Sequence, residues 1–284
     1  MESNGFSEKF RVKPGQAITL ARLATDNTDT FKNADDARPQ TQAYTDRLRE
    51  LQYLLFAQGK HGLLICLQAM DSGGKDGTIR HVLGVMNPQG CRVQGFKVPT
   101  PQEAAHDFLW RIHKAVPGRG EVVIFNRSHY EDVLVTRVHQ LVPKSVWLPR
   151  YDAINHFEDY LVENGIHVLK FFLHISKEEQ LKRFKKRFEN PERHWKISES
   201  DYTDRVHWDA YQQAYEDALN RCSTEQAPWF VIPADKKWFR DLAVAEIVVE
   251  FLSSLDMHTP APTVDIEAIK KKYHEELLKE KNGM

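Results

Sequence analysis

The stretch Gly62-Leu-Leu-Ile-Cys-Leu-Gln-Ala-Met-Asp-Ser-Gly-Gly-Lys-Asp-Gly-Thr-Ile79 decides the fold of this chain. Its apolar run from Leu63 to Leu67 predicts a buried strand, which gives way to a glycine turn and then to a helix from Thr78. This order is typical of a phosphate-binding loop, because glycines let backbone N–H groups surround phosphate oxygens while a lysine and a helix N-terminus add positive potential. The expected phosphate-binding residues are Ser72, Gly73, Gly74, Lys75, Asp76 and Gly77.

Two positions depart from the usual pattern G-x-x-x-x-G-K-[ST] of such a loop. Ala69 stands where the first glycine belongs, and Asp76 replaces the Ser or Thr that normally binds magnesium. A further carboxylate, Asp71, lies inside the loop. Two acids beside a phosphate repel it unless a cation or a transferable proton lies between them. The alternative interpretation is a plain glycine turn that carries an exposed aspartate and lysine.

The composition is that of a soluble enzyme. A chain of 284 residues forms one large α/β domain or two small ones, and a hydrophobic content of 41% is enough for a sizeable core. The net charge of -1 does not argue against a polyanionic ligand, because charged residues are locally clustered. The three cysteines (Cys66, Cys91, Cys222) are widely spaced, which predicts reduced thiols and a cytoplasmic setting. The N-terminus has no signal-peptide pattern, and no apolar stretch reaches membrane length.

Strands that alternate with helical stretches predict an α/β fold with a parallel sheet covered on both faces. Tyr44, Leu48, Leu51 and Leu55 lie at helical spacing in a helix over 41–58, and Pro101 begins another that carries Phe108 and Ile112. Strands are expected at 63–67, 91–96, 121–125, 166–175 and 229–232. We interpret residues 1–284 as one domain, with an irregular arm over 1–40 and a charged tail over 258–284. The tail ends in an amphipathic helix that is either a surface cover or a partner contact.

Ligands gather at the carboxyl ends of the strands in open α/β sheets, so these ends are candidate sites. The third strand ends in Phe125-Asn-Arg-Ser-His-Tyr-Glu-Asp132. A P-loop enzyme usually has a magnesium-organising acid here, but this chain has Asn126. Arg127 follows at once and can fork onto phosphate oxygens. The alternative is that Ser128 and its neighbours only cap the next helix.

A basic segment, Lys177 to Lys196, follows the fourth strand, where phosphoryl-transfer enzymes carry a mobile lid. Most of the cations Lys182, Arg183, Lys185, Lys186 and Arg187 are expected on a solvated helix face. A stronger indication of a phosphate-binding lid is a set of cationic and aromatic residues around an Asn190-Pro191 break: Arg187, Arg193, His194, Trp195 and Lys196. The residues His106, Asp107, Trp110 and Arg111 face either the core or a ligand.

Three segments together resemble the polyphosphate kinase 2 family: 67–78, 125–133 and 190–196. The resemblance runs from about Phe10 to Leu255. The Asn-Arg-Ser-His-Tyr-Glu-Asp form is similar to class III, whose members phosphorylate both AMP and ADP. The resemblance implies a P-loop kinase-like three-layer sandwich with a central parallel sheet and a helical lid over about 177–200. It also implies reversible transfer of a terminal phosphoryl group between inorganic polyphosphate and a nucleotide, in a homo-oligomer that is a dimer or a tetramer.

The same resemblance implies roles for individual residues. The implied catalytic residues are Asp71, which binds Mg²⁺ with Mn²⁺ as a substitute, Lys75, which holds the transferring phosphoryl group, Arg127 and Arg187. Arg80 and Lys196 bind polyphosphate, and Asp132 is a second candidate for the metal. The nucleotide contacts are Asn126, Arg127, Phe96, Asp107, Arg111 and Tyr130.

Two rival functions remain open from the sequence. An ATP-dependent nucleotide kinase shares the fold and the lid, but it normally keeps the first loop glycine and the loop Ser or Thr. A non-catalytic nucleotide-binding switch or scaffold does not need so many lid cations. The expected partners are polyphosphate and adenine nucleotides, with guanine nucleotides left open, and neither nucleic acid nor a membrane.

Overall fold

The computed structural model describes residues 5–197 and 199–281, and one parallel sheet forms its centre. The strand order is β2-β3-β1-β4-β5, and each neighbouring pair is parallel. The strands are β1 (Gly62–Ala69), β2 (Cys91–Gly95), β3 (Val122–Asn126), β4 (Ile166–His174) and β5 (Trp229–Pro233). Every residue of β1 is buried, because this strand lies at the middle of the sheet with helices on both faces.

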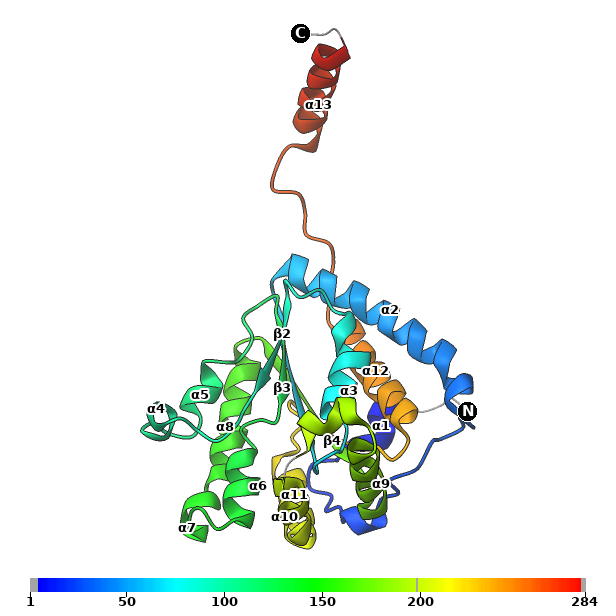
Figure 1. The fold of residues 1–284 in the computed structure, drawn as a ribbon. Coiled ribbons are helices and arrows are strands. Elements are labelled where there is room, and N and C mark those ends of the chain that lie inside the picture. Colours follow the sequence, from blue (N-terminus) through cyan, green and yellow to red (C-terminus); the bar gives the residue numbers. More distant parts are fainter. Residues whose placement is uncertain (1–4, 198, 282–284) are drawn as a thin grey trace.

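Helices cover both faces of the sheet, so the protein has three layers (Figure 1). The helices α2 and α12 pack together on one face with α1 and α3, and α8 packs against β4 on the other beside α6 and α11. The predicted three-layer α/β fold is therefore confirmed. The helices are α1 (Phe6–Phe10), α2 (Ala34–Gln58), α3 (Lys75–His81), α4 (Pro101–Ala104), α5 (Trp110–His113), α6 (Glu131–Val138), α7 (Lys144–Trp147), α8 (Arg150–Glu163), α9 (Lys177–Phe188), α10 (Glu199–Val206), α11 (Trp208–Cys222), α12 (Lys237–Ser254) and α13 (Ile266–Lys281).

The order of the strands places a candidate site. The chain leaves β1 toward β2 and β3 on one side and then crosses to β4 on the other, so the connections diverge at β1. Crevices at such a switch point, beyond the carboxyl ends of the strands, are where open α/β sheets bind ligands. The carboxyl end of β1 leads directly into the phosphate loop.

The N-terminal arm contributes to the core, which the sequence did not reveal. Phe6 and Phe10 of α1 are buried, and the ring of Phe6 meets that of Phe239 edge-on at 5.4 Å. The first long helix begins at Ala34 rather than at residue 41. Its start is set by Asn33, whose side chain accepts hydrogen bonds from the backbone N–H groups of the first turn.

Other boundaries differ from the sequence-based expectation for local reasons. The helix expected from Pro101 to Ile112 is two short helices, α4 and α5, separated by the turn at Asp107. All three cysteines are free, as predicted, but Cys91 is only partly buried because β2 is an edge strand. None of the described helices is long and apolar enough to cross a membrane.

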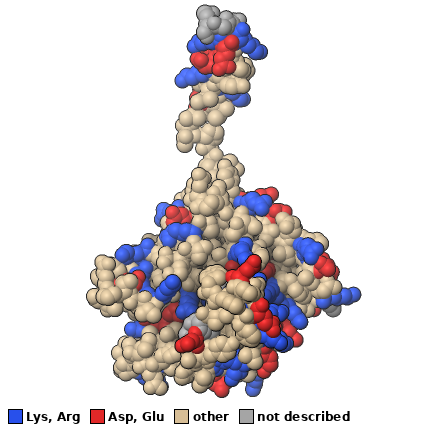
Figure 2. Space-filling view, viewed as in Figure 1, with Lys and Arg blue, Asp and Glu red and all other residues tan. Residues whose placement is uncertain are grey.

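The C-terminal helix α13 stands away from the body of the protein (Figures 1 and 2). None of its residues is buried, so it does not cover the surface of its own domain. Lys, Arg, Asp and Glu side chains are interspersed over the face of the body seen in Figure 2. Residues 1–4, 198 and 282–284 of the predicted arm, lid and tail lie outside the described residues.

Candidate active site

The phosphate loop connects β1 to α3 and depends on two adjacent glycines. Gly74 has φ +113°, a conformation that side chains with a Cβ rarely adopt. Gly73 packs so closely that a Cβ there would lie 2.4 Å from the Cβ of Ala69 and 2.8 Å from the carbonyl oxygen of Met70. The glycines therefore allow the tight turn that brings backbone N–H groups together at the start of α3.

Lys75 lies at the first position of α3 and points back along the loop. Its Nζ donates a hydrogen bond to the carbonyl oxygen of Ala69 at 3.1 Å. Burial lowers the pKa of Lys75, and the neighbouring positive charge of Arg127 lowers it further. A bound phosphate would offset both effects, because an anion favours the charged ammonium.

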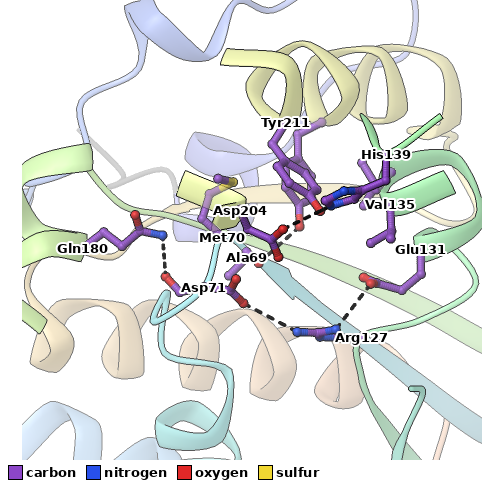
Figure 3. A pocket seen from close by; sticks show the side chains of 12 residues that line it. Ala69, Met70, Asp71, Arg127, Glu131, Val135, His139, Gln180, Asp204 and Tyr211 are labelled. Atoms are coloured by element: carbon purple, nitrogen blue, oxygen red, sulfur yellow. Dashed lines mark hydrogen bonds and ion pairs between the residues drawn. The ribbon is translucent and has the colours of Figure 1, made fainter. Parts of the chain in front are cut away.

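Arg127 bridges two carboxylates at the carboxyl end of β3 (Figure 3). Its guanidinium lies 3.5 Å from Asp71 in the phosphate loop and 3.8 Å from Glu131 at the start of α6. The backbone of Arg127 has φ +66°, which is unusual for a residue with a long side chain. Burial raises the pKa of Glu131, while Arg127 and Lys75 act in the opposite direction. The loop and the β3–α6 turn thus meet through alternating charges.

An open cavity lies beside this charged row, and the space within it, counted together with adjoining open solvent, is about 570 Å³. On its far wall the His139 Nε2 lies 3.1 Å from Asp204 and 3.0 Å from the Tyr211 hydroxyl (Figure 3). The rest of the wall consists of apolar and aromatic side chains and of Gln180, whose amide donates to the Asp71 carbonyl oxygen at 2.9 Å. The lining residues are Ala69, Met70, Asp71, Arg127, Glu131, Leu134, Val135, His139, Gln180, Asp204, Tyr211 and Tyr215.

Of the predicted site residues, the structure brings Asp71 and Arg127 into this cavity and places Lys75 next to it. The side chains of His139, Asp204, Tyr211 and Tyr215 were not predicted. His139 directly follows α6, Asp204 lies in α10, and Tyr211 and Tyr215 lie in α11. Nothing in their local sequence distinguishes them from ordinary surface or helix residues. Only the packing of α11 against α6 brings them to the loop.

Two buried arginines lie against the phosphate loop. Arg183 is 6% exposed and donates to the carbonyl oxygens of Ser72 at 2.9 Å and Gly73 at 3.0 Å. Lys182, Lys185 and Lys186 are exposed, as expected for most of the basic run in α9, and Arg183 is the buried exception. Arg240 of α12 is 1% exposed, and its guanidinium fills the space where a Cβ of Gly74 would stand. The phosphate loop is therefore held in place by two side chains that are far away from it in the sequence.

The two departures from the usual motif meet in space. The Asn126 Nδ2 donates a hydrogen bond to the Asp76 Oδ1 at 3.0 Å. An aspartate at position 126 would instead place two carboxylates side by side. The amide at the end of β3 and the acid in the loop are thus mutually compatible, which the separate motifs could not indicate.

Among the predicted nucleotide contacts, the structure contradicts Tyr130, while Phe96 and Arg111 make contacts within the protein. Tyr130 is fully buried and hydrogen-bonded to Glu158, so its side chain faces the core and offers no surface to a nucleotide. Phe96 is also buried, with its ring edge-on to Phe125 at 4.8 Å. Arg111 donates to the carbonyl oxygen of Lys97 at 2.8 Å, and its guanidinium lies over the ring of Phe96.

The remaining predicted residues lie around the loop or on the lid. Asp107 is exposed, and its carboxylate accepts a hydrogen bond from the backbone of Leu109 in the turn before α5. Arg80 is exposed on α3, where it contacts His81. Arg187 of α9 lines a small apolar cavity with Phe184 and Phe188 instead of the cavity beside Asp71. The side chain of Lys196 lies outside the described residues.

The acids of the site bear on whether a divalent cation fits. Asp132 does not face Asp71, because its carboxylate pairs with Arg150 at 3.2 Å and Arg111 at 3.9 Å. Among the described residues no group of three or more His, Cys, Asp or Glu side chains could hold a metal. Magnesium, however, is commonly held by one or two carboxylates together with substrate phosphates. Asp71 lines the cavity and is partly exposed, so its carboxylate fits such a site.

Comparisons with known proteins agree on one family. A family model described as Polyphosphate kinase 2 (PPK2) matches residues 31–260. The AMP/ADP-polyphosphate phosphotransferase of Meiothermus ruber is 52% identical over 263 residues, covering 92% of this chain and 98% of that protein. The ADP-polyphosphate phosphotransferase of Rhodopseudomonas palustris is 42% identical, covering 90% of this chain and 93% of that protein.

A solved structure extends the similarity to three dimensions. The crystal structure of Polyphosphate Kinase 2 from Arthrobacter aurescens TC1 matches with a TM-score of 0.92 at 42% identity, and the match covers 96% of this chain and 97% of that one. The two chains thus share one overall fold over nearly their whole lengths. This chain belongs to the polyphosphate kinase 2 family.

Proposed function

We propose that this enzyme transfers the terminal phosphoryl group of inorganic polyphosphate to AMP and to ADP, forming ADP and ATP reversibly. The observation that carries the proposal is the position of Arg127 between Asp71 of the phosphate loop and Glu131. An acid inside the loop, faced by an arginine, suits a reaction in which both substrates bring phosphates. The names of the relatives from Meiothermus ruber and Rhodopseudomonas palustris support the same activity.

In this reaction the bond between the terminal phosphorus and its bridging oxygen breaks, and a bond to a phosphate oxygen of AMP or ADP forms. Polyphosphate leaves one unit shorter. Such a transfer depends mostly on positioning and charge neutralisation. We assign the binding of the transferring group to Lys75 and the loop N–H groups, and the neutralisation of the acceptor phosphate to Arg127.

We assign the metal to Asp71, because the Arg127 guanidinium lies between this carboxylate and that of Glu131. The Asp71 carboxylate fits a divalent cation that substrate phosphates complete, and we propose Mg²⁺ with Mn²⁺ as a substitute. Such a cation supplies neutralisation of the negative charge on bridging phosphates. We further propose a cytoplasmic enzyme that assembles as a dimer or tetramer.

The donor separates this proposal from an ATP-dependent nucleotide kinase. Ala69 and Asp76 stand where that class normally keeps a glycine and a Ser or Thr, and both family relatives are named polyphosphate phosphotransferases. Turnover of AMP is measured with Mg²⁺ and either polyphosphate or ATP as donor. Turnover with ATP but not with polyphosphate would contradict the proposal, and turnover with neither would favour a binding protein.

We expect the wild type to convert AMP to ADP and then onward to ATP with polyphosphate. Asn126→Asp should bias it toward a single acceptor, because the new carboxylate would stand beside Asp76 and repel a neighbouring phosphate unless a cation intervenes. Chromatography of the products over time measures both steps. The double variant Asn126→Asp with Asp76→Asn again has one amide and one acid at these two positions. It should recover part of the conversion of ADP to ATP. A wild type that stops at ADP, or that refuses AMP, would exclude dual acceptance.

The lid prediction concerns Arg187 and Lys196. If these cations act only when residues 177–200 close over the bridging phosphates, replacing Arg187 by Ala should lower turnover much more than it weakens AMP binding. We expect AMP affinity without donor, measured by calorimetry, to stay within about threefold of the wild type. Lys196→Ala should behave in the same way. Equal losses of affinity and turnover would place these residues in the acceptor site.

A further inference from the structure

A cluster of charged and polar side chains is buried immediately behind the active site. Glu158 of α8, Lys170 of β4 and the loop residues His129 and Tyr130 are each 0% exposed. Buried charges are costly unless they are paired and hydrogen-bonded, so the arrangement of this cluster is informative. We call these four residues the Glu158 cluster.

Glu158 is the hub of the cluster and accepts from three donors. The His129 Nε2 and the Tyr130 hydroxyl each lie 3.0 Å from its Oε1, and the Lys170 ammonium bonds its Oε2. Lys170 also donates to the Tyr130 hydroxyl at 3.1 Å and to the carbonyl oxygen of Cys222 at 2.6 Å. Burial alone would raise the pKa of Glu158, but Lys170 and His129 outweigh it, so the pKa lies below its usual value. Both charges are thus satisfied inside the protein.

The loop side of the cluster is continuous with Arg127. Ser128, His129 and Tyr130 follow Arg127 directly in the chain, and all three are fully buried. The Ser128 Oγ accepts from the Gln68 side chain of β1 at 3.2 Å, so the same turn is also tied to the central strand. The cluster therefore connects the turn to α8, β4 and β1, which are rigid elements.

Arg127 needs such support because of its backbone. A non-glycine residue at φ +66° costs free energy and persists only where the surroundings hold it. Its guanidinium must also stay between Asp71 and Glu131, and Glu131 begins α6 directly after Tyr130. The side chains that follow Arg127 thus anchor both the arginine and its second carboxylate.

We infer that the Glu158 cluster positions Arg127 for phosphoryl transfer, with Glu158, Lys170, His129 and Tyr130 as positioning residues that touch no substrate. This inference rests on the proposed function for the identity of the reaction. A purely structural role would not need the hub to bond the turn beside Arg127, since apolar side chains of similar volume often stabilise a core equally well.

Two variants of different severity test the inference. Glu158→Gln keeps the shape of the hub but removes its charge, and Tyr130→Phe removes one hydrogen bond and keeps the ring. Misplacing a binding group by about 1 Å can cost about 100-fold, so kcat/KM with polyphosphate and AMP should fall roughly 10- to 100-fold for Glu158→Gln and about three- to tenfold for Tyr130→Phe. The matched control is Tyr44→Phe, which also deletes a Tyr–Glu hydrogen bond, at 2.9 Å, but between α2 and α12. It should leave kcat/KM unchanged.

A double-mutant cycle with Arg127→Ala distinguishes positioning from general weakening of the fold. If the cluster acts through Arg127, adding Glu158→Gln or Tyr130→Phe to Arg127→Ala should lower kcat/KM by less than about a further twofold. The same cycle is run on the Kd for tripolyphosphate by calorimetry, with folding checked by circular dichroism. The inference would be overturned if the fold-losses of the two single variants multiplied in full in the double variant. It would also be overturned if the folded single variants had wild-type kcat/KM and Kd. A wild type without turnover would instead overturn the proposed function, and the cycle on Kd would still decide the inference.

Discussion

Lys75→Ala and Asp71→Ala should each lower kcat with polyphosphate by more than about 100-fold, the scale of losing one preorganised charge contact. Lys75 is the ammonium at the start of α3, and Asp71 is the loop carboxylate that faces Arg127 at 3.5 Å. Neither side chain supports the core, so we expect the free energy of unfolding to change by only about 0.5 kcal/mol. Initial rates of ADP formation, together with denaturant unfolding curves, measure the two effects separately.

Lys60→Ala is the matched control for this experiment. Lys60 is exposed just before the opposite end of β1, so its loss removes a lysine without touching the phosphate loop. Its kcat should equal that of the wild type. Substantial activity in Lys75→Ala or Asp71→Ala, with the fold intact, would place the transfer centre elsewhere.

Gly73→Ala should abolish measurable transfer and also destabilise the protein. The new Cβ would lie 2.4 Å from the Ala69 Cβ and 2.8 Å from a backbone oxygen, so the loop itself must shift. Overpacking of this kind typically costs about 1–3 kcal/mol. A displacement of the loop N–H groups by about 1 Å would cost about 100-fold in kcat. Rates and thermal unfolding are measured on the same preparation.

Gly118→Ala provides the control for a glycine substitution as such. The nearest atom to a Cβ at Gly118 lies at 3.7 Å, which is ordinary van der Waals contact, and its backbone needs no positive φ. This variant should keep both its melting temperature and its activity. If Gly73→Ala kept its melting temperature and activity as Gly118→Ala does, the loop would accommodate a Cβ at position 73. Close packing at Gly73 would then not be required for the site.

The order of strands and helices could be predicted from the sequence because it depends on short-range patterns. Apolar runs such as Leu63 to Leu67 form buried strands. The glycine turn after this run marks the end of the strand and the start of the next helix. The predicted strands agree with the observed ones to within a few residues. The predicted helix boundaries were wrong where a capping residue decides them. Asn33 caps the start of α2, so that this helix begins seven residues earlier than expected.

By itself, the sequence determined the α/β fold, the phosphate loop with Asp71 and Lys75, and the arginine that follows β3, because each is written in contiguous residues. Only the tertiary structure decided which neighbours face the site. Tyr130 points into the core and Glu131 toward Arg127, although the two are adjacent, because the phase of α6 against the sheet sets their directions. Likewise Arg183 and Arg240 reach the loop from α9 and α12, and contacts between such distant segments leave no local pattern in the sequence.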